Sequence, residues 1–222
     1  MDFMKLLRSF EEFIFEAVTW LIFYPLTLWR IVTRPLTTMA YSDGEQSDPD
    51  EKRYDEALSP PLLLLVTVVA VNAIAGALHP DTPPTDTTLA KALFASPQNL
   101  TLFRALIFSL VPLVAAATLL KRGKIALSRE TIRPPFYAQC YLATPCCIVI
   151  GLGHAIFQRP DISNALGATL LIAGGAWFFV TQIRWFRSRL AVSWVNATLT
   201  TLWAFVQAVA YLILVFLPVA FI

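Results

Sequence analysis

The chain of 222 residues has little charge, because only 14% of its residues are Asp, Glu, Lys or Arg. A soluble domain carries about a quarter. Apolar residues make up 57% of the chain, and the mean hydropathy is +0.63. This composition excludes a disordered chain, a nucleic-acid binder and an ordinary soluble enzyme. It is typical of an integral membrane protein.

Patterns that carry catalytic chemistry are also missing. The sequence has no GxxxxGK[ST] loop, no GxGxxG turn after a strand, no HExxH motif and no GxSxG elbow. Its three cysteines, Cys140, Cys146 and Cys147, share one apolar run and give neither a disulfide framework nor a CxxC pair. Only four acids follow residue 58, all in predicted loops, whereas coupled transport usually needs a carboxylate inside the membrane. We predict no enzyme activity, no catalytic residue, no metal site and no cofactor.

Long apolar runs dominate the chain after residue 58. A bilayer core of about 30 Å needs about 20 apolar residues in a helix. The runs that meet this length are Pro61–Leu78, Leu100–Leu120, Phe136–Phe157 and Asn164–Ile183. In a fifth run, Leu190–Ile222, we place the buried part at Thr198–Pro218, with the first turns at headgroup depth or the helix tilted. The sequence thus predicts an all-α fold, a polytopic membrane bundle of five transmembrane helices in residues 59–222.

Lys and Arg are concentrated in two of the predicted loops. Those loops hold eight of the 11 bases after residue 58: Lys121, Arg122, Lys124, Arg129, Arg133, Arg184, Arg187 and Arg189. Because cytoplasmic loops are enriched in Lys and Arg, both loops are predicted to be cytoplasmic, with the N-terminus on the same side and the C-terminus periplasmic. We expect a bacterial inner membrane protein whose basic loops bind anionic lipid headgroups, and no nucleic-acid partner.

Residues 1–40 are amphipathic and precede the spans. Polar residues from Lys5 to Arg34 fall within an arc of about 100° on a helical projection, opposite Phe, Leu, Ile, Val and Trp. The pattern favours a helix that lies in the membrane interface and is kinked or broken near Pro25. The alternative is a sixth span, Phe13–Trp29, with the N-terminus outside. Residues 41–58 are rich in acids and are predicted to form a solvated cytoplasmic linker.

Polar residues and prolines inside the spans are the candidate functional residues, since each is costly in lipid. Arg104 lies about one turn inside the second span, where snorkelling to the headgroups is favoured over a buried pairing role. His154 is expected at the membrane interface. The side-chain amides of Asn and Gln are expected to form hydrogen bonds between helices, and the prolines in the middle of spans are expected to kink their helices. The candidates for helix packing or for a pathway are Asn72, Arg104, Pro112, Gln139, Tyr141, Pro145, His154, Gln182 and Gln207.

Two short elements suggest a family. The first span starts with Leu58-Ser59-Pro60-Pro61, and the third contains Cys140-Tyr141-Leu142-Ala143-Thr144-Pro145. With the five-span layout, residues 58–222 resemble the Yip1 domain superfamily, in its bacterial members labelled as permeases. The acidic-aromatic-glycine-proline motif and the Gly-Tyr pair of the eukaryotic members are absent. The resemblance implies a non-enzymatic membrane domain that works by protein contact.

These features favour a structural or scaffold subunit of a membrane assembly, which binds another membrane protein or a second copy of itself. The alternative is a small permease or channel subunit. Pro112 and Pro145 support the alternative, because broken helices also build transporter sites.

Overall fold

The computed structural model describes residues 3–46, 53–54, 57–78, 87–159 and 163–221. Every regular element in these ranges is a helix: α1 (Phe3–Thr33), α2 (Pro35–Glu45), α3 (Pro60–Leu78), α4 (Thr88–Phe94), α5 (Pro97–Arg122), α6 (Arg129–Phe157), α7 (Asn164–Leu190) and α8 (Trp194–Phe221). Five of them, α3, α5, α6, α7 and α8, are long and apolar enough to cross a bilayer. The predicted all-α membrane bundle is therefore confirmed.

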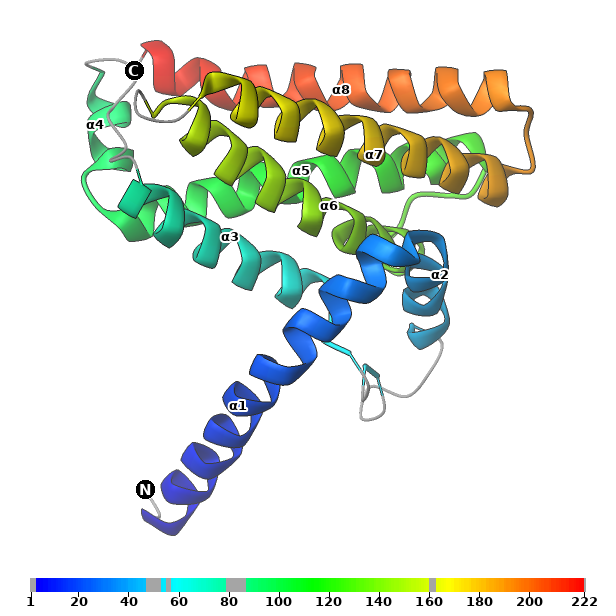
Figure 1. Cartoon of the computed structure of the whole chain (residues 1–222). Coiled ribbons are helices and arrows are strands. Elements are labelled where there is room, and N and C mark those ends of the chain that lie inside the picture. Colours follow the sequence, from blue (N-terminus) through cyan, green and yellow to red (C-terminus); the bar gives the residue numbers. More distant parts are fainter. Residues whose placement is uncertain (1–2, 47–52, 55–56, 79–86, 160–162, 222) are drawn as a thin grey trace.

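Helix α6 lies at the centre of the bundle. It packs against α3, α5 and α7, and both α1 and α2 contact it. Half of its most apolar stretch is buried inside the protein, against 28% or less in the other four spans. Figure 1 shows α3 and α8 at opposite edges of the bundle, with α6 between them. The helix with the predicted Tyr…Pro element is thus the one around which the others pack.

At α5 and α6, capping residues rather than the limits of the apolar runs set where the span begins. α6 starts at Arg129, well before the predicted Phe136, because Ser128 and Thr131 form a capping box. The Ser128 hydroxyl accepts from the Thr131 amide at 3.1 Å, and the Ser128 amide donates to the Thr131 hydroxyl at 2.9 Å. α8 is one helix of 28 residues. At 1.5 Å per residue it is about 42 Å long, which leaves room for the predicted tilt or headgroup-level first turn.

The break in the N-terminal segment lies at Arg34 and not near Pro25. α1 continues through Pro25 and ends at Thr33. Arg34 has a φ of −136°, and Pro35 then occupies the first turn of α2. A residue before proline avoids the helical region, which accounts for the break at Arg34. The same preference acts on the residue before Pro25, so contacts elsewhere must hold α1 together there.

Those contacts join the C-terminal half of α1 to the bundle. The Tyr24 hydroxyl lies 3.0 Å from the Thr67 hydroxyl of α3, and the Thr27 hydroxyl accepts from the Leu58 amide at 3.4 Å. Ile31 is fully buried in the same contact. Figure 1 shows the N-terminal half of α1 inclined away from the bundle. The apolar part of α1 is only Val18–Thr33, shorter than each of the five spans.

The described part of the acidic linker is packed against the protein and is not solvated as predicted. The Tyr54 ring stacks on Tyr137 of α6 with centroids 6.3 Å apart, and the Tyr54 hydroxyl accepts from Gln46 Nε2 at 2.7 Å. Ser42 is fully buried beside it, 3.1 Å from the same hydroxyl. Burial raises the pKa of the Tyr54 phenol above its usual value. The linker's aromatic residues account for the difference, because they bury apolar surface despite the acids around them. Residues 47–52 and 55–56 lie outside the described residues.

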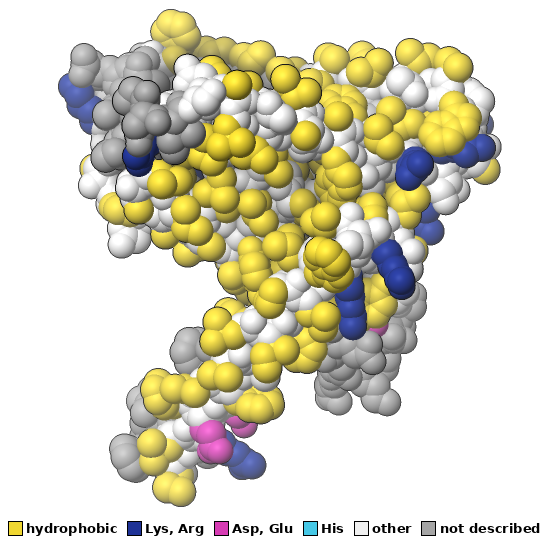
Figure 2. Space-filling view, viewed as in Figure 1, with side chains coloured by type: hydrophobic (Ala, Val, Ile, Leu, Met, Phe, Trp, Pro, Cys, Tyr) yellow, Lys and Arg dark blue, Asp and Glu magenta, His cyan; other side chains and the backbone are white. Residues whose placement is uncertain are grey.

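The two ends of the bundle differ in charge. We call the end with α2, the α5–α6 loop and the α7–α8 turn the α2 end, and the opposite end the α4 end (Figure 1). Figure 2 shows several Lys and Arg side chains over the α2 end, while hydrophobic side chains cover most of the visible bundle. Both predicted basic loops therefore lie at the same end as α2.

Candidate functional site

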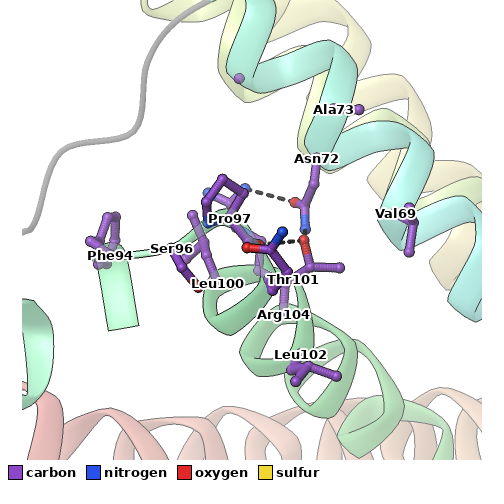
Figure 3. Close-up of a pocket in the computed structure, with 12 residues that line it drawn as sticks. Val69, Asn72, Ala73, Phe94, Ser96, Pro97, Leu100, Thr101, Leu102 and Arg104 are labelled. Carbon is purple, nitrogen blue, oxygen red and sulfur yellow. Dashed lines mark hydrogen bonds between the residues drawn. The ribbon is translucent and has the colours of Figure 1, made fainter. Parts of the chain in front are cut away.

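A polar contact joins α3 and α5 near the α4 end. Arg104 Nη1 donates to Asn72 Oδ1 at 2.7 Å, and Asn72 Nδ2 donates to the Thr101 hydroxyl at 3.1 Å (Figure 3). Both Asn72 and Arg104 are half-buried. The guanidinium therefore has a protein partner at this depth, and the predicted snorkelling to the headgroups stays a prediction. Its partner is an amide oxygen of α3, which accepts a charge-assisted hydrogen bond.

Two hollows meet at this contact. The lateral groove, of about 830 Å³, lies between α3, α4 and the start of α5, and Figure 3 shows residues that line it. Its apolar walls include Val69, Leu102 and Phe94. The four-helix cavity, of about 370 Å³, lies between α3, α5, α6 and α7. Asn72 and Arg104 line both hollows, so their hydrogen bond stands between the groove and the cavity.

His154 lies on the exposed side of the four-helix cavity. Its Nε2 atom is 2.8 Å from Gln158 Nε2, one helical turn further along α6, and both side chains are exposed. Buried Cys147 lines the same cavity. In the ranges that the structure describes, no group of three His, Cys, Asp or Glu side chains could hold a metal ion. His79, the other histidine, lies outside the described residues.

The predicted interhelical hydrogen bonds occur for only some of the amides. Gln207 of α8 accepts from the Thr118 hydroxyl of α5 at 3.4 Å, as expected. Gln139 and Gln182 are each 2% exposed, and their Nε2 atoms have no hydrogen-bond partner among the described residues. The same holds for Oε1 of Gln182.

Tyr141 links the two elements on which the family resemblance rests. It is fully buried, and its hydroxyl donates to the Leu58 carbonyl at 2.8 Å. The segment before α3 is thereby fastened to the middle helix of the bundle. α5 and α6 continue as helices through Pro112 and Pro145, which are both buried. The side chains of Tyr141, Pro112 and Pro145 line neither the lateral groove nor the four-helix cavity.

Sequence reasoning missed the contact that joins α2 to α7. Asp43 of α2 forms an ion pair with Arg189 at the end of α7. The Arg189 guanidinium also lies 4.7 Å from the ring centroid of Trp185, which is 2% exposed. The sequence shows acids concentrated before residue 58 and bases after it, which is compatible with such a pair. It did not indicate which residues form it, because that depends on how the helices fold.

An apolar stripe runs along the side of α1 that faces away from the bundle. Its exposed side chains recur at helical spacing, opposite the buried Thr27 and Ile31: Met4, Leu7, Phe10, Ile14, Phe15, Val18, Leu21, Ile22, Leu26, Trp29 and Val32. Figure 2 shows hydrophobic side chains along most of α1, with charged side chains near its N-terminal end. We call these eleven residues the α1 stripe.

Comparison of the chain with protein-family models, with curated proteins and with solved structures gives no match. The resemblance to the Yip1 domain superfamily stays a prediction from the residues. The function is therefore inferred from the α1 stripe, from the two hollows at Arg104 and from the charge at the α2 end.

Proposed function

We propose that this chain is a non-enzymatic scaffold subunit that binds another membrane protein, or a second copy of itself, through the α1 stripe. The observation that carries the proposal is that eleven apolar side chains are exposed along one side of α1, whose other side is buried against the bundle in its C-terminal half, around Thr27 and Ile31. A large exposed apolar patch marks a contact with a protein or a membrane. Three aromatic residues lie in the stripe, Phe10, Phe15 and Trp29, and aromatic residues are enriched in protein interfaces.

The C-terminal half of the stripe is held in position by contacts on the other side of α1 and at its end. Besides the bonds of Tyr24 and Thr27, the Thr38 hydroxyl of α2 contacts the Arg30 and Arg34 carbonyls at 3.2 and 2.9 Å. These bonds fix the direction in which α1 leaves the bundle. A surface that is ordered before binding loses less conformational entropy when a partner docks, which supports a role in protein contact.

The proposed setting is a bacterial inner membrane with the α2 end in the cytoplasm. The two basic loops lie at that end, which supports a cytoplasmic position by the positive-inside rule. The ion pair between Asp43 and Arg189 holds the N-terminal segment at the same end. The C-terminus, at the α4 end, is then periplasmic. Membership of the Yip1 domain superfamily is part of this proposal, and it rests on the sequence resemblance of residues 58–222.

Native mass spectrometry of the full chain in a mild detergent tests the scaffold function. We expect a stoichiometric complex with a second membrane protein or a second copy. The double variant Phe15→Ser/Leu21→Ser, at positions 70% and 76% exposed, should abolish that complex. The matched control Ile213→Ser/Leu214→Ser, at positions 58% and 61% exposed on α8, should leave it intact. A monomeric wild-type chain, or equal loss in the control, would contradict the proposal.

A small permease or channel subunit is the second candidate. The supporting observation is that Asn72 and Arg104 stand between the lateral groove and the four-helix cavity. Uptake of labelled solutes into proteoliposomes tests it, with the wild-type chain compared with Arg104→Ala. Uptake that the variant abolishes would establish the permease. Absence of uptake across a broad panel of solutes, with the complex above intact, would exclude it.

A further inference from the structure

We propose that a pocket at the α2 end binds the phosphate headgroup of one anionic phospholipid. The basic pocket, of about 600 Å³, lies where the end of α5, the end of α7 and the start of α8 meet. Arg122, Lys124 and Arg189 line it, together with Asn196 and Thr200 of α8. Basic pockets between transmembrane helices at the cytoplasmic side are typical binding sites for phosphate headgroups.

The charges in the pocket favour an anion. Arg122 and Lys124 are exposed, and in the part of the chain that the structure describes neither forms an ion pair. Asp43, which does not line the pocket, pairs with Arg189, so three cations of the pocket stand against one nearby carboxylate. A guanidinium presents its N–H groups in a fork that fits two phosphate oxygens, and an ammonium binds phosphate as a point charge. A phosphate diester would therefore offset part of the excess positive charge.

Backbone and cap hydrogen bonds order the chain on both sides of the pocket, and side-chain contacts fix Arg189. At the end of α5, the Ile125 amide donates to the Leu120 carbonyl at 2.9 Å and closes the turn that contains Lys124. At the start of α8, the Ser193 hydroxyl accepts from the Asn196 amide at 3.3 Å. Arg189 is fixed by its ion pair and by the ring of Trp185. One cation is thus positioned before a ligand arrives, and the backbone that carries the other two is ordered, which favours a defined site over a diffuse basic surface.

The surroundings of the pocket point to a lipid rather than a soluble phosphate. Leu190 and Val192 form part of its wall, and Leu199, which is 57% exposed, continues from it along the outer side of α8. Beside the pocket, Arg187 lies 4.2 Å from the ring centroid of exposed Trp194. Tryptophan gathers at the depth of the headgroups, so this turn lies where a lipid phosphate would be. The glycerol and the acyl chains would then follow Leu199.

A lipid-binding measurement on the full chain, delipidated in a neutral detergent, tests the site. Phosphatidylglycerol and phosphatidylcholine with identical acyl chains are titrated by native mass spectrometry. We expect one phosphatidylglycerol to bind about tenfold or more tightly than phosphatidylcholine, equivalent to at least about 1.4 kcal/mol. Glycerol phosphate without acyl chains should not compete in the same concentration range. Equal affinity for the two lipids would overturn the proposal, and competition by glycerol phosphate would overturn the assignment to a lipid.

Two double variants distinguish binding in the basic pocket from diffuse attraction to the charged loops. Arg122→Gln/Lys124→Gln should reduce the preference for phosphatidylglycerol about tenfold. Lys121→Gln/Arg129→Gln removes the same charge from the same region outside the pocket and should preserve the preference. Both pairs are exposed, so unfolding without lipid should match the wild type. Equal loss in both variants would mean diffuse attraction and would overturn the site. The Phe15→Ser/Leu21→Ser chain should bind the lipid normally, which keeps this test independent of the scaffold function.

Discussion

Gly167 of α7 packs against the backbone of α6 with no room for a side chain. A Cβ atom there would lie 2.8 Å from the Phe157 amide nitrogen and 2.9 Å from the Gly153 carbonyl oxygen. These are backbone atoms, which cannot rotate away as a side chain does. Small residues that allow such close approach are a main source of helix association in membranes, where water does not drive the helices together.

Gly167→Ala should therefore lower the free energy of unfolding. Overpacking of this kind costs about 1–3 kcal/mol. A Cβ atom at Gly175 on the same helix would meet nothing within 4 Å, so Gly175→Ala is the matched control. It should be neutral or stabilising by up to about 1 kcal/mol, because alanine favours the helix. Denaturant unfolding in detergent micelles measures both changes, and an equal effect of the two variants would show that α6 and α7 do not meet at Gly167.

Tyr141→Phe tests the fastening of the linker to α6. The variant keeps the buried ring and removes only the hydroxyl that donates to the Leu58 carbonyl. A buried acceptor left without its partner costs about 1–3 kcal/mol, so the unfolding free energy should fall by that amount. Tyr211→Phe, at an exposed position on α8, is the control and should change little. The prediction is wrong if Tyr141→Phe unfolds like the wild-type chain.

At the scale of elements, α2 is held on the end of α7 by charge as well as by packing. Asp43 is 15% exposed and Arg189 is 40% exposed, so water screens their ion pair only in part. A double-mutant cycle with Asp43→Asn and Arg189→Gln should give a coupling energy of about 1 kcal/mol that falls with added salt. A control cycle that combines Asp43→Asn with Arg184→Gln should give no coupling energy. Coupling that salt does not change would mean that the pair acts through packing alone.

The elements could be predicted from the sequence to very different degrees. The five spans were predictable because about 20 apolar residues in a row is a signal that lies entirely along the chain. The position of the break between α1 and α2 was not predictable, because the residues before Pro25 and Pro35 both disfavour the helical conformation. Only the contacts of Tyr24 and Thr27 with the bundle decide between them. The packing of the linker depended likewise on Tyr54 meeting Tyr137, far away in the sequence.

The candidate site was predictable residue by residue but not as an arrangement. Asn72 and Arg104 each drew attention because polar groups are costly in lipid. Their pairing depends on how α3 and α5 are rotated relative to each other, which the periodicity of one helix does not give. The contact of His154 with Gln158 could have been predicted, because residues four apart are neighbours on a helix. The basic pocket could not, since its three cations come from two separate helix ends.

At the scale of the whole molecule, the distribution of charge predicts the direction of insertion. Eight Lys and Arg residues lie in the two loops at the α2 end, and the α2 contact adds the N-terminal segment to that end. Cysteines introduced at Lys124 and Arg8 should therefore react with a membrane-impermeant maleimide only from the cytoplasmic side. A cysteine at exposed Gln98, at the α4 end, should react only from the periplasmic side. The three native cysteines are first replaced by alanine to remove background. Labelling of position 8 from the periplasm alone would mean that α1 crosses the bilayer, and the α1 stripe would then face lipid rather than a partner at the cytoplasmic interface.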